Sequence, residues 1–213
     1  MLRLPCTSVV CLSDYIDSEL TFAPHVKRVA AQCFHHLRQL WTIRRALSDD
    51  NARMLVHALI SNCVDYCNSI LHRVAVVHLR PFQSVLNAAA WLIVRKRKFD
   101  HITPTLRDDL HWLPVDKRIE FKLCLLAFKY QHQMAPPYLA SMCVQLSADT
   151  RSRQLRSAAR YDLLIPRTRT ASYGPRSFAV SGPTCWNSLP LQLKSASLTL
   201  QQFCDRFKTT VFS

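Results

Sequence analysis

The sequence predicts a mainly α fold, in which a helical bundle is followed by a small, irregular α+β basic region. Three observations carry this prediction. The 213 residues include only two glycines, so tight hairpin turns, which favour glycine or asparagine at positive φ, have few places to form. The first two thirds repeat apolar residues at three- and four-residue steps, as amphipathic helices do. Residues typical of helix starts, such as Ser48 and Thr103, precede these repeats.

The first two predicted helices lie on either side of Ser48. The first begins near Pro24, which fits a first helical turn, and extends to about Leu47. Ser48 is the expected N-cap of the second, and Asp49 and Asp50 complement its dipole. The expected apolar faces are Val26, Val29, Cys33, Leu37 and Leu40 in the first helix, and Leu55, Leu59, Cys63, Tyr66 and Ile70 in the second.

Four further helices are expected before the C-terminal region. One spans about Val76–Val94, a short one runs from Thr103 to about Leu110, and a long one opens after Leu113 and stops at the two prolines 136 and 137. A last short helix covers residues 138–146. The inner faces of the two longer helices are Leu79, Phe82, Leu86, Ala89 and Ile93, and Val115, Ile119, Leu123, Leu126, Ala127 and Tyr130.

The C-terminal region has a different composition. Between Asp149 and Arg176 there are seven arginines and two acids, with Ser, Thr and Pro between them. Short strands are predicted at residues 161–165 and 177–180, a helical turn at 186–189, and a terminal amphipathic helix over about residues 200–211. Trp112 and Trp186 are expected to anchor the core beside Leu-Pro corners rather than to stack on bases.

Composition excludes several functions. The Rossmann and Walker phosphate-binding loops need glycines that this sequence does not have. No apolar run approaches the roughly 18 residues of a membrane span, and the N-terminus has no convincing signal peptide, so no membrane partner is expected. Nine cysteines at irregular spacing do not resemble a secreted disulfide framework, so the expected location is intracellular, nuclear or cytoplasmic.

The net charge of +14 predicts a polyanionic partner. The excess is uneven: residues 1–72 carry seven basic and six acidic groups, residues 73–135 eleven and five, and residues 136–213 ten and three. We therefore expect salt-dependent, non-specific contacts with an RNA or DNA backbone. The predicted nucleic-acid-binding residues are Arg95, Lys96, Arg97, Lys98, Arg151, Arg153, Arg156, Arg160, Arg167 and Arg169.

Several strings are more specific than composition. They include Asp100-His101-Ile102-Thr103-Pro104, Leu110-His111-Trp112-Leu113-Pro114-Val115, Pro136-Pro137-Tyr138-Leu139 and Trp186-Asn187-Ser188-Leu189-Pro190. In this order they resemble the segment that follows the reverse transcriptase core in LINE-type (non-LTR) retrotransposons of the jockey-like superfamily. The resemblance implies that residues 1–20 are a remnant of the polymerase palm edge, 21–146 a helical thumb-like domain, and 147–213 a basic C-terminal extension.

The resemblance also implies what the chain lacks. Polymerases of this family hold two metal ions with a palm aspartate and a Tyr-x-Asp-Asp hairpin, and this hairpin motif is absent from the sequence. We therefore expect a non-catalytic fragment without a cofactor. Cys63, Cys67 and His72 form the best metal candidate, but a fourth ligand is missing, and buried apolar cysteines are the preferred interpretation. An activity regained by truncation is a weaker alternative.

The resemblance also implies that several glycines of the family are replaced by other residues in this chain. Where such elements carry glycine, this chain has Ser13, Arg73, Arg95 and Gln133. We expect these turns to place non-glycine residues at positive φ, at a cost of about 1 kcal/mol each. Such drift favours the alternative hypothesis of an inert or protein-interaction-only product of a degraded element.

Overall fold

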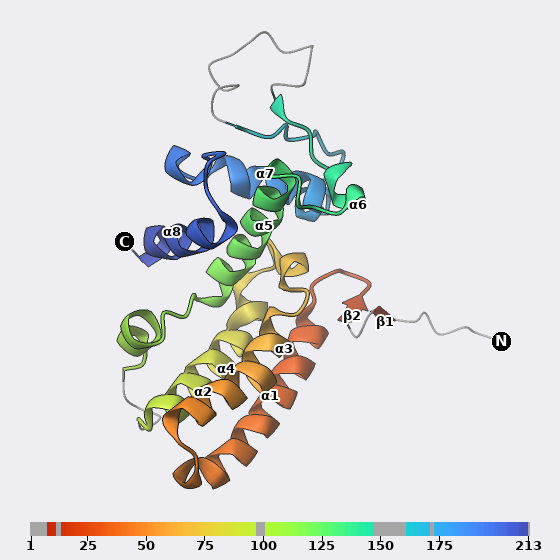
Figure 1. Cartoon of the computed structure of the whole chain (residues 1–213). Coiled ribbons are helices and arrows are strands. Elements are labelled where there is room, and N and C mark those ends of the chain that lie inside the picture. Colours follow the sequence, from red (N-terminus) through yellow and green to blue (C-terminus); the bar gives the residue numbers. More distant parts are fainter. Residues whose placement is uncertain (1–7, 12–13, 97–100, 147–160, 171–172, 213) are drawn as a thin grey trace, which may run out of the picture. The chain divides into compact units, whose positions relative to one another are not determined.

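The computed structural model describes the chain except for residues 1–7, 12–13, 97–100, 147–160, 171–172 and 213 (Figure 1). It is mainly helical, as predicted. The chain divides into two compact units, unit 1 (residues 1–116) and unit 2 (residues 117–213). This division falls thirty residues before the predicted boundary after residue 146. None of the helices in the described part combines the length and apolarity that a membrane crossing needs.

Unit 1 begins with a β-hairpin, and its last residue fixes the backbone directly before the first helix. Strand β1 (Ser8–Cys11) pairs antiparallel with β2 (Asp14–Asp17), with Ser8 opposite Asp17. The Asp17 carboxylate accepts hydrogen bonds from the Thr21 hydroxyl at 2.7 Å and from the backbone N–H groups of Thr21 at 2.9 Å and Phe22 at 2.7 Å. These bonds hold Phe22 at φ 56, directly before α1 (Ala23–Ile43). Pro24 lies in the first turn of α1, as predicted.

The core of unit 1 lies mainly between α1 and α4 (Val76–Val94), which pack side by side (Figure 1). All five predicted inner residues of α4 are buried, and so are four of the five on α1, Val29 being the exception. Both predicted faces are thereby largely confirmed. The side chain of Arg44, in the short 3₁₀ turn η1 (Arg44–Ala46) after α1, bonds carbonyls at the end of α4. The C-terminal ends of the two helices therefore meet.

The predicted apolar face of the second helix is wrong. Helix α2 (Asp49–Val56), the π-helical turn η2 (His57–Ser61) and α3 (Asn62–Asp65) form one continuous stretch. Its buried apolar residues are Ala52, Val56, Ile60 and Val64, whereas Cys63 and Tyr66 are exposed. A strict four-residue repeat drifts around an α-helix of 3.6 residues per turn, but the wider π turn absorbs this drift and keeps the four side chains on one face.

The same helix also ends earlier than predicted. It stops at Asp65 rather than near Ile70, because Cys67 takes φ 49 and a 3₁₀ turn, η3 (Asn68–Leu71), follows. The predicted short helix near residue 103 is present, and it includes the π turn η4 (Thr105–Asp109). The long helix α5 (Val115–Gln131) also forms as expected, and its first N–H donates to Gln83 Oε1 at 3.1 Å.

Unit 2 departs furthest from the predicted secondary structure. The expected helix over residues 138–146 is only α6 (Pro137–Ala140), and Gln145 instead forms an isolated antiparallel bridge with Leu163. That bridge is what remains of the predicted strand 161–165. The predicted strand 177–180 is wrong, because Ser177 stands at the N-cap of α7 (Phe178–Asn187).

Gly182 and Pro183 explain the error over residues 177–180. A Gly-Pro pair commonly marks the end of a regular element, but both residues lie inside α7. A Cβ on Gly182 would lie 2.9 Å from Cε2 of Phe178, so the absence of a side chain lets the Phe178 ring pack there. Residues 186–187, predicted as a separate helical turn, are the end of the same helix. The 3₁₀ turn η8 (Leu191–Leu193) and helix α8 (Leu200–Phe212) follow, the latter as predicted.

Unit 2 is built around an aromatic cluster. The Phe128 ring of α5 stacks on Phe203 of α8 at a centroid distance of 4.5 Å, and Trp186 lies 6.2 Å from Phe203. Trp186 is fully buried, which confirms its predicted role as a core anchor, whereas Trp112 is only half-buried. Because α5 supplies this cluster, most of α5 belongs to unit 2.

Left-handed backbone at non-glycine residues occurs in both units. Arg73, Arg95 and Gln133 have φ values of 59, 55 and 56, which confirms the expectation for these three positions. Ser13 lies outside the described residues. Neither glycine has positive φ. The chain therefore places larger residues at turns where glycine costs least, at about 1 kcal/mol each. Other positive-φ residues are Leu20, Phe22, Cys67, His111 and Tyr161.

Candidate nucleic-acid interface

Arg95 and Lys96 are the described members of the predicted basic run, and both have intramolecular partners. Arg95 ends α4; its Nη2 donates to the Leu47 carbonyl at 3.3 Å and lies 3.3 Å from Oδ1 of Asp49. The Arg95 side chain nevertheless remains 55% exposed. Lys96 donates from Nζ to the Thr105 hydroxyl at 2.7 Å. Arg97 and Lys98 lie outside the described residues.

The C-terminal arginines belong to unit 2. Arg167 and Arg169 are exposed and follow the segment that bridges to Gln145. Within the described ranges neither forms an ion pair, so their charges face solvent. Arg151, Arg153, Arg156 and Arg160 lie outside those ranges. The described members of the predicted set are therefore Arg95 and Lys96 in unit 1 and Arg167 and Arg169 in unit 2.

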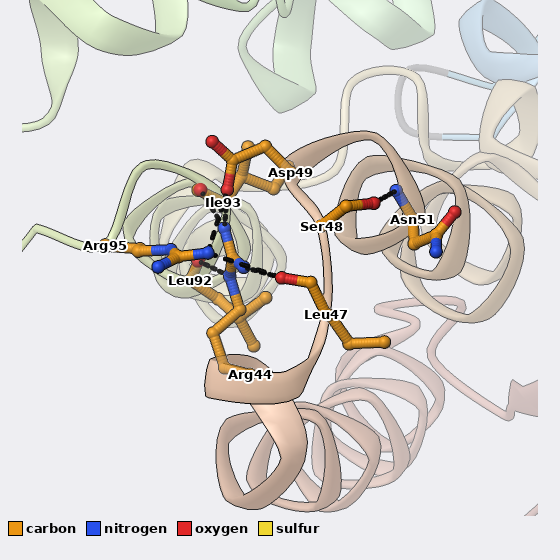
Figure 2. A network of polar contacts seen from close by, with 8 residues as sticks. All are labelled: Arg44, Leu47, Ser48, Asp49, Asn51, Leu92, Ile93 and Arg95. Atoms are coloured by element: carbon orange, nitrogen blue, oxygen red, sulfur yellow. Dashed lines mark hydrogen bonds and ion pairs between the residues drawn. The ribbon is translucent and has the colours of Figure 1, made fainter.

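A buried arginine joins three helix ends in unit 1 (Figure 2). The Arg44 guanidinium donates from Nε to the Leu92 carbonyl at 2.8 Å, from Nη2 to the Ile93 carbonyl at 2.8 Å, and from Nη1 to the Leu47 carbonyl at 3.0 Å. Nη2 also pairs with Oδ1 of Asp49 at 2.5 Å. Carbonyls at the end of a helix lack intrahelical partners, so Arg44 caps α4 while holding the turn that leads to α2.

Ser48 is the N-cap of α2 and Asp49 lies in the first turn, as predicted, and Asp49 also pairs with Arg44 and Arg95. The Ser48 hydroxyl accepts from the Asn51 backbone N–H at 3.2 Å. The hydrogen bond from Arg44, together with the nearby charge of Arg95, holds the pKa of Asp49 below its ordinary value of 3.8 despite some desolvation. Part of the positive charge of this region is therefore used to fix the fold.

The Trp-Asn-Ser-Leu-Pro string forms a polar clamp in unit 2. Trp186 Nε1 donates to the Tyr161 carbonyl at 2.8 Å. Asn187 accepts from the Leu163 N–H at 2.9 Å and donates to the Leu163 carbonyl at 2.8 Å. The buried Lys194 ammonium donates to Asp162 at 2.8 Å and to the Asn187 carbonyl at 2.7 Å. This string therefore holds the segment at residues 161–163 in place.

The proposed metal ligands do not assemble. Among the described residues no three His, Cys, Asp or Glu side chains gather closely enough to hold an ion. Cys63 is exposed, so it also departs from the expectation of a buried cysteine. Cys33, Cys124, Cys143 and Cys185 are buried, as apolar residues are, and burial together with the neighbouring Cys63 raises the pKa of the Cys33 thiol to about 12.

A groove between α1 and α4 was not predicted. It has a volume of about 520 Å³ and is lined by Phe34, Trp41, Ser84, Asn87, Ala88 and Trp91. No role was predicted for Trp41 or Trp91 from the sequence. The available signal is the spacing: Phe34 and Trp41 are two helical turns apart, and so are Ser84 and Trp91, so each pair shares one helix face.

No protein-family model, no curated protein and no solved structure matches this chain.

Proposed function

We propose that this chain is the non-catalytic C-terminal region of a LINE-type retrotransposon reverse transcriptase, with thumb-like helices and a basic extension, and that it binds RNA or DNA backbones without sequence preference. The observation that carries the binding proposal is the charge of +14, with Arg167 and Arg169 exposed and unpaired among the described residues. Such side chains bind phosphates by releasing condensed counterions. The contacts are assigned to the ten basic residues named from the sequence.

The backbone supports the proposed origin. The resemblance singles out Arg73, Arg95 and Gln133 as replacements of glycine, and all three adopt the left-handed conformation that glycine favours. This coincidence is explained if the ancestral turns had glycine at these positions and the glycines were later replaced. Strained turns at these three positions are also expected of the competing hypothesis, an inert product that has no ligand.

Fluorescence anisotropy with labelled single-stranded RNA, single-stranded DNA and duplex DNA separates these hypotheses. The proposal predicts binding to all three at about 50 mM salt. Combined Arg167→Ala and Arg169→Ala substitution is expected to weaken binding to each, as is alanine substitution of residues 95–98. The matched control is Arg53→Ala on α2, which removes one exposed charge outside the assigned residues. Absence of binding to every probe overturns the proposal.

Two further measurements address the alternatives. Thermal unfolding is expected to be cooperative, since both units have buried cores, whereas a broad melt would support the inert product. Incubation with a primed template, deoxynucleotides and Mg²⁺ or Mn²⁺ is expected to give no extension. Extension of the primer would show a polymerase activity and contradict the non-catalytic assignment.

A further inference from the structure

The groove between α1 and α4 combines aromatic rings with hydrogen-bonding groups. Trp41 is 44% exposed although its indole is large, and Phe34 and Trp91 add two more rings to the lining. The volume of about 520 Å³ falls within the roughly 300–1,000 Å³ of small-molecule sites. Exposed tryptophans in a concave site are typical of surfaces that stack a planar ligand.

The polar groups of the groove have hydrogen-bonding capacity left. Gln83 donates to Asn87 Oδ1 at 2.9 Å, which fixes the Asn87 amide with its NH₂ group as the remaining donor. Within the described residues this NH₂ group has no acceptor. The Ser84 hydroxyl donates to the Arg80 carbonyl at 3.1 Å and keeps its acceptor capacity. Donor and acceptor together match the edge of a nucleobase.

The positive charge around the groove indicates that the ligand carries negative charge beside its planar ring. Neither α1 nor α4 contains an aspartate or a glutamate. Arg38 lies between Phe34 and Trp41 on α1, and Arg80 lies one turn before Ser84 on α4. Both arginines are exposed, and neither forms an ion pair with any described residue. A ligand that places a planar ring in the groove would therefore be attracted if it carried negative charge on both sides.

We propose that this groove binds an unpaired nucleobase of single-stranded RNA or DNA, with the base stacked on Trp41 and Trp91 and the flanking phosphates on Arg38 and Arg80. This inference rests on the proposed nucleic-acid binding and adds a site to it. Single-stranded nucleic acids are bound elsewhere by the same combination of aromatic platforms and basic side chains. The site would make unit 1 favour single strands over duplexes, whose bases are paired and stacked.

The test compares a short oligothymidylate with an abasic strand of the same length, using the full chain. The two probes carry the same phosphates, so their difference reports on the bases. We expect the wild-type chain to bind oligothymidylate at least about fivefold more tightly, in line with base–aromatic stacking. Trp41→Ala is expected to abolish this preference while leaving binding of the abasic strand nearly unchanged. Tyr138→Ala, which removes an exposed ring in unit 2, is the control that retains the preference.

A second variant and three outcomes complete the test. Ala88→Leu fills the groove without removing a ring or a charge, so it is expected to abolish the preference as well, with melting curves showing that both variants fold. Equal wild-type binding of the two probes overturns the base site and leaves the phosphate contacts standing. Binding of neither probe overturns both proposals. Tryptophan quenching by an acidic aromatic peptide but not by oligothymidylate would assign the groove to a protein partner, against the proposal.

Discussion

Among the described residues, Arg44 is the Arg or Lys side chain buried in unit 1 and Lys194 the one buried in unit 2, and the two are neutralised differently. The side chains of Arg44 in unit 1 and Lys194 in unit 2 are 4% and 3% exposed. Their acidic partners differ: the Asp49 side chain is 66% exposed, whereas Asp162 is 17% exposed. Arg44 also donates to three backbone carbonyls, and Lys194 to one. Arg44 therefore acts mainly as a helix cap, while Lys194 depends on a partly buried ion pair.

Removing the acids should give the largest difference between the units. Asp162→Asn leaves Lys194 buried without its counterion, and we expect a loss of about 3 kcal/mol in the free energy of unfolding. Asp49→Asn leaves the three carbonyl bonds of Arg44 intact, so only a small fraction of that loss is expected. Urea denaturation of both variants measures the two losses. Equal losses would contradict the different roles assigned to the two cations.

The Asn187 clamp should give the next largest effect. Asn187→Ala removes two hydrogen bonds to the Leu163 backbone, and at about 1 kcal/mol each we expect a loss of about 2 kcal/mol. Amide hydrogen exchange at Leu163 should also become faster. Asn62→Ala, at an exposed helical position in unit 1, is the matched control, with an expected change within about 0.5 kcal/mol. A loss for Asn187→Ala no greater than for the control would exclude the clamp.

Glycine substitutions should stabilise both units. Arg73→Gly in unit 1 and Gln133→Gly in unit 2 relieve left-handed backbone, so each is expected to raise the free energy of unfolding by about 1 kcal/mol. Arg53→Gly, inside α2, is expected to lower it by about the same amount because it loosens a regular helix. Calorimetry of the three variants provides the comparison. A destabilising effect of both turn substitutions would show that the left-handed turns are not strained.

Acid sensitivity should give the smallest effect and should involve unit 1. Asp49 is held below its ordinary pKa by Arg44, and Asp17 is held below it because hydrogen bonds from Thr21 and Phe22 outweigh desolvation. A lowered folded-state pKa means that the unfolded chain binds protons first. The stabilisation is therefore complete above pH 3.8 and is lost as the pH falls through the folded-state values. Melting temperatures of wild type and Asp49→Asn should converge below that pH; a constant difference would contradict the pairing.

Local signals were enough to predict part of this structure. The α4 face followed from an ordinary helical repeat, and Ser48 from its N-cap chemistry. The positive φ of Arg73, Arg95 and Gln133 followed from the residues that the resemblance expects there. The helix face and the N-cap depend on neighbours in the sequence, whereas the three positive φ values were expected only from the resemblance.

Features that depend on distant residues were missed. The buried face of the stretch from α2 to α3 lies one residue from the predicted face, because the packing of α2 on α4 and of α3 on α1, not the local pattern, selects that face. Gly182 suggested the end of a strand, because its contact with Phe178 inside α7 is not visible in the local sequence. The groove could not be assigned because it needs α1 and α4 in register, although its aromatic residues are visible in the sequence.

The proposed function depends most on phosphate recognition by the basic side chains, and the salt dependence of binding tests this recognition directly. The slope of log K for a single-stranded RNA against log salt, measured between about 50 and 200 mM, counts the phosphate contacts at about 0.7 per contact. With the ten assigned basic residues available, we predict a slope of about −3 or steeper, reduced in magnitude by about 1 or more in the Arg167→Ala, Arg169→Ala double variant. A slope near zero, or an unchanged slope in that variant, would contradict the account.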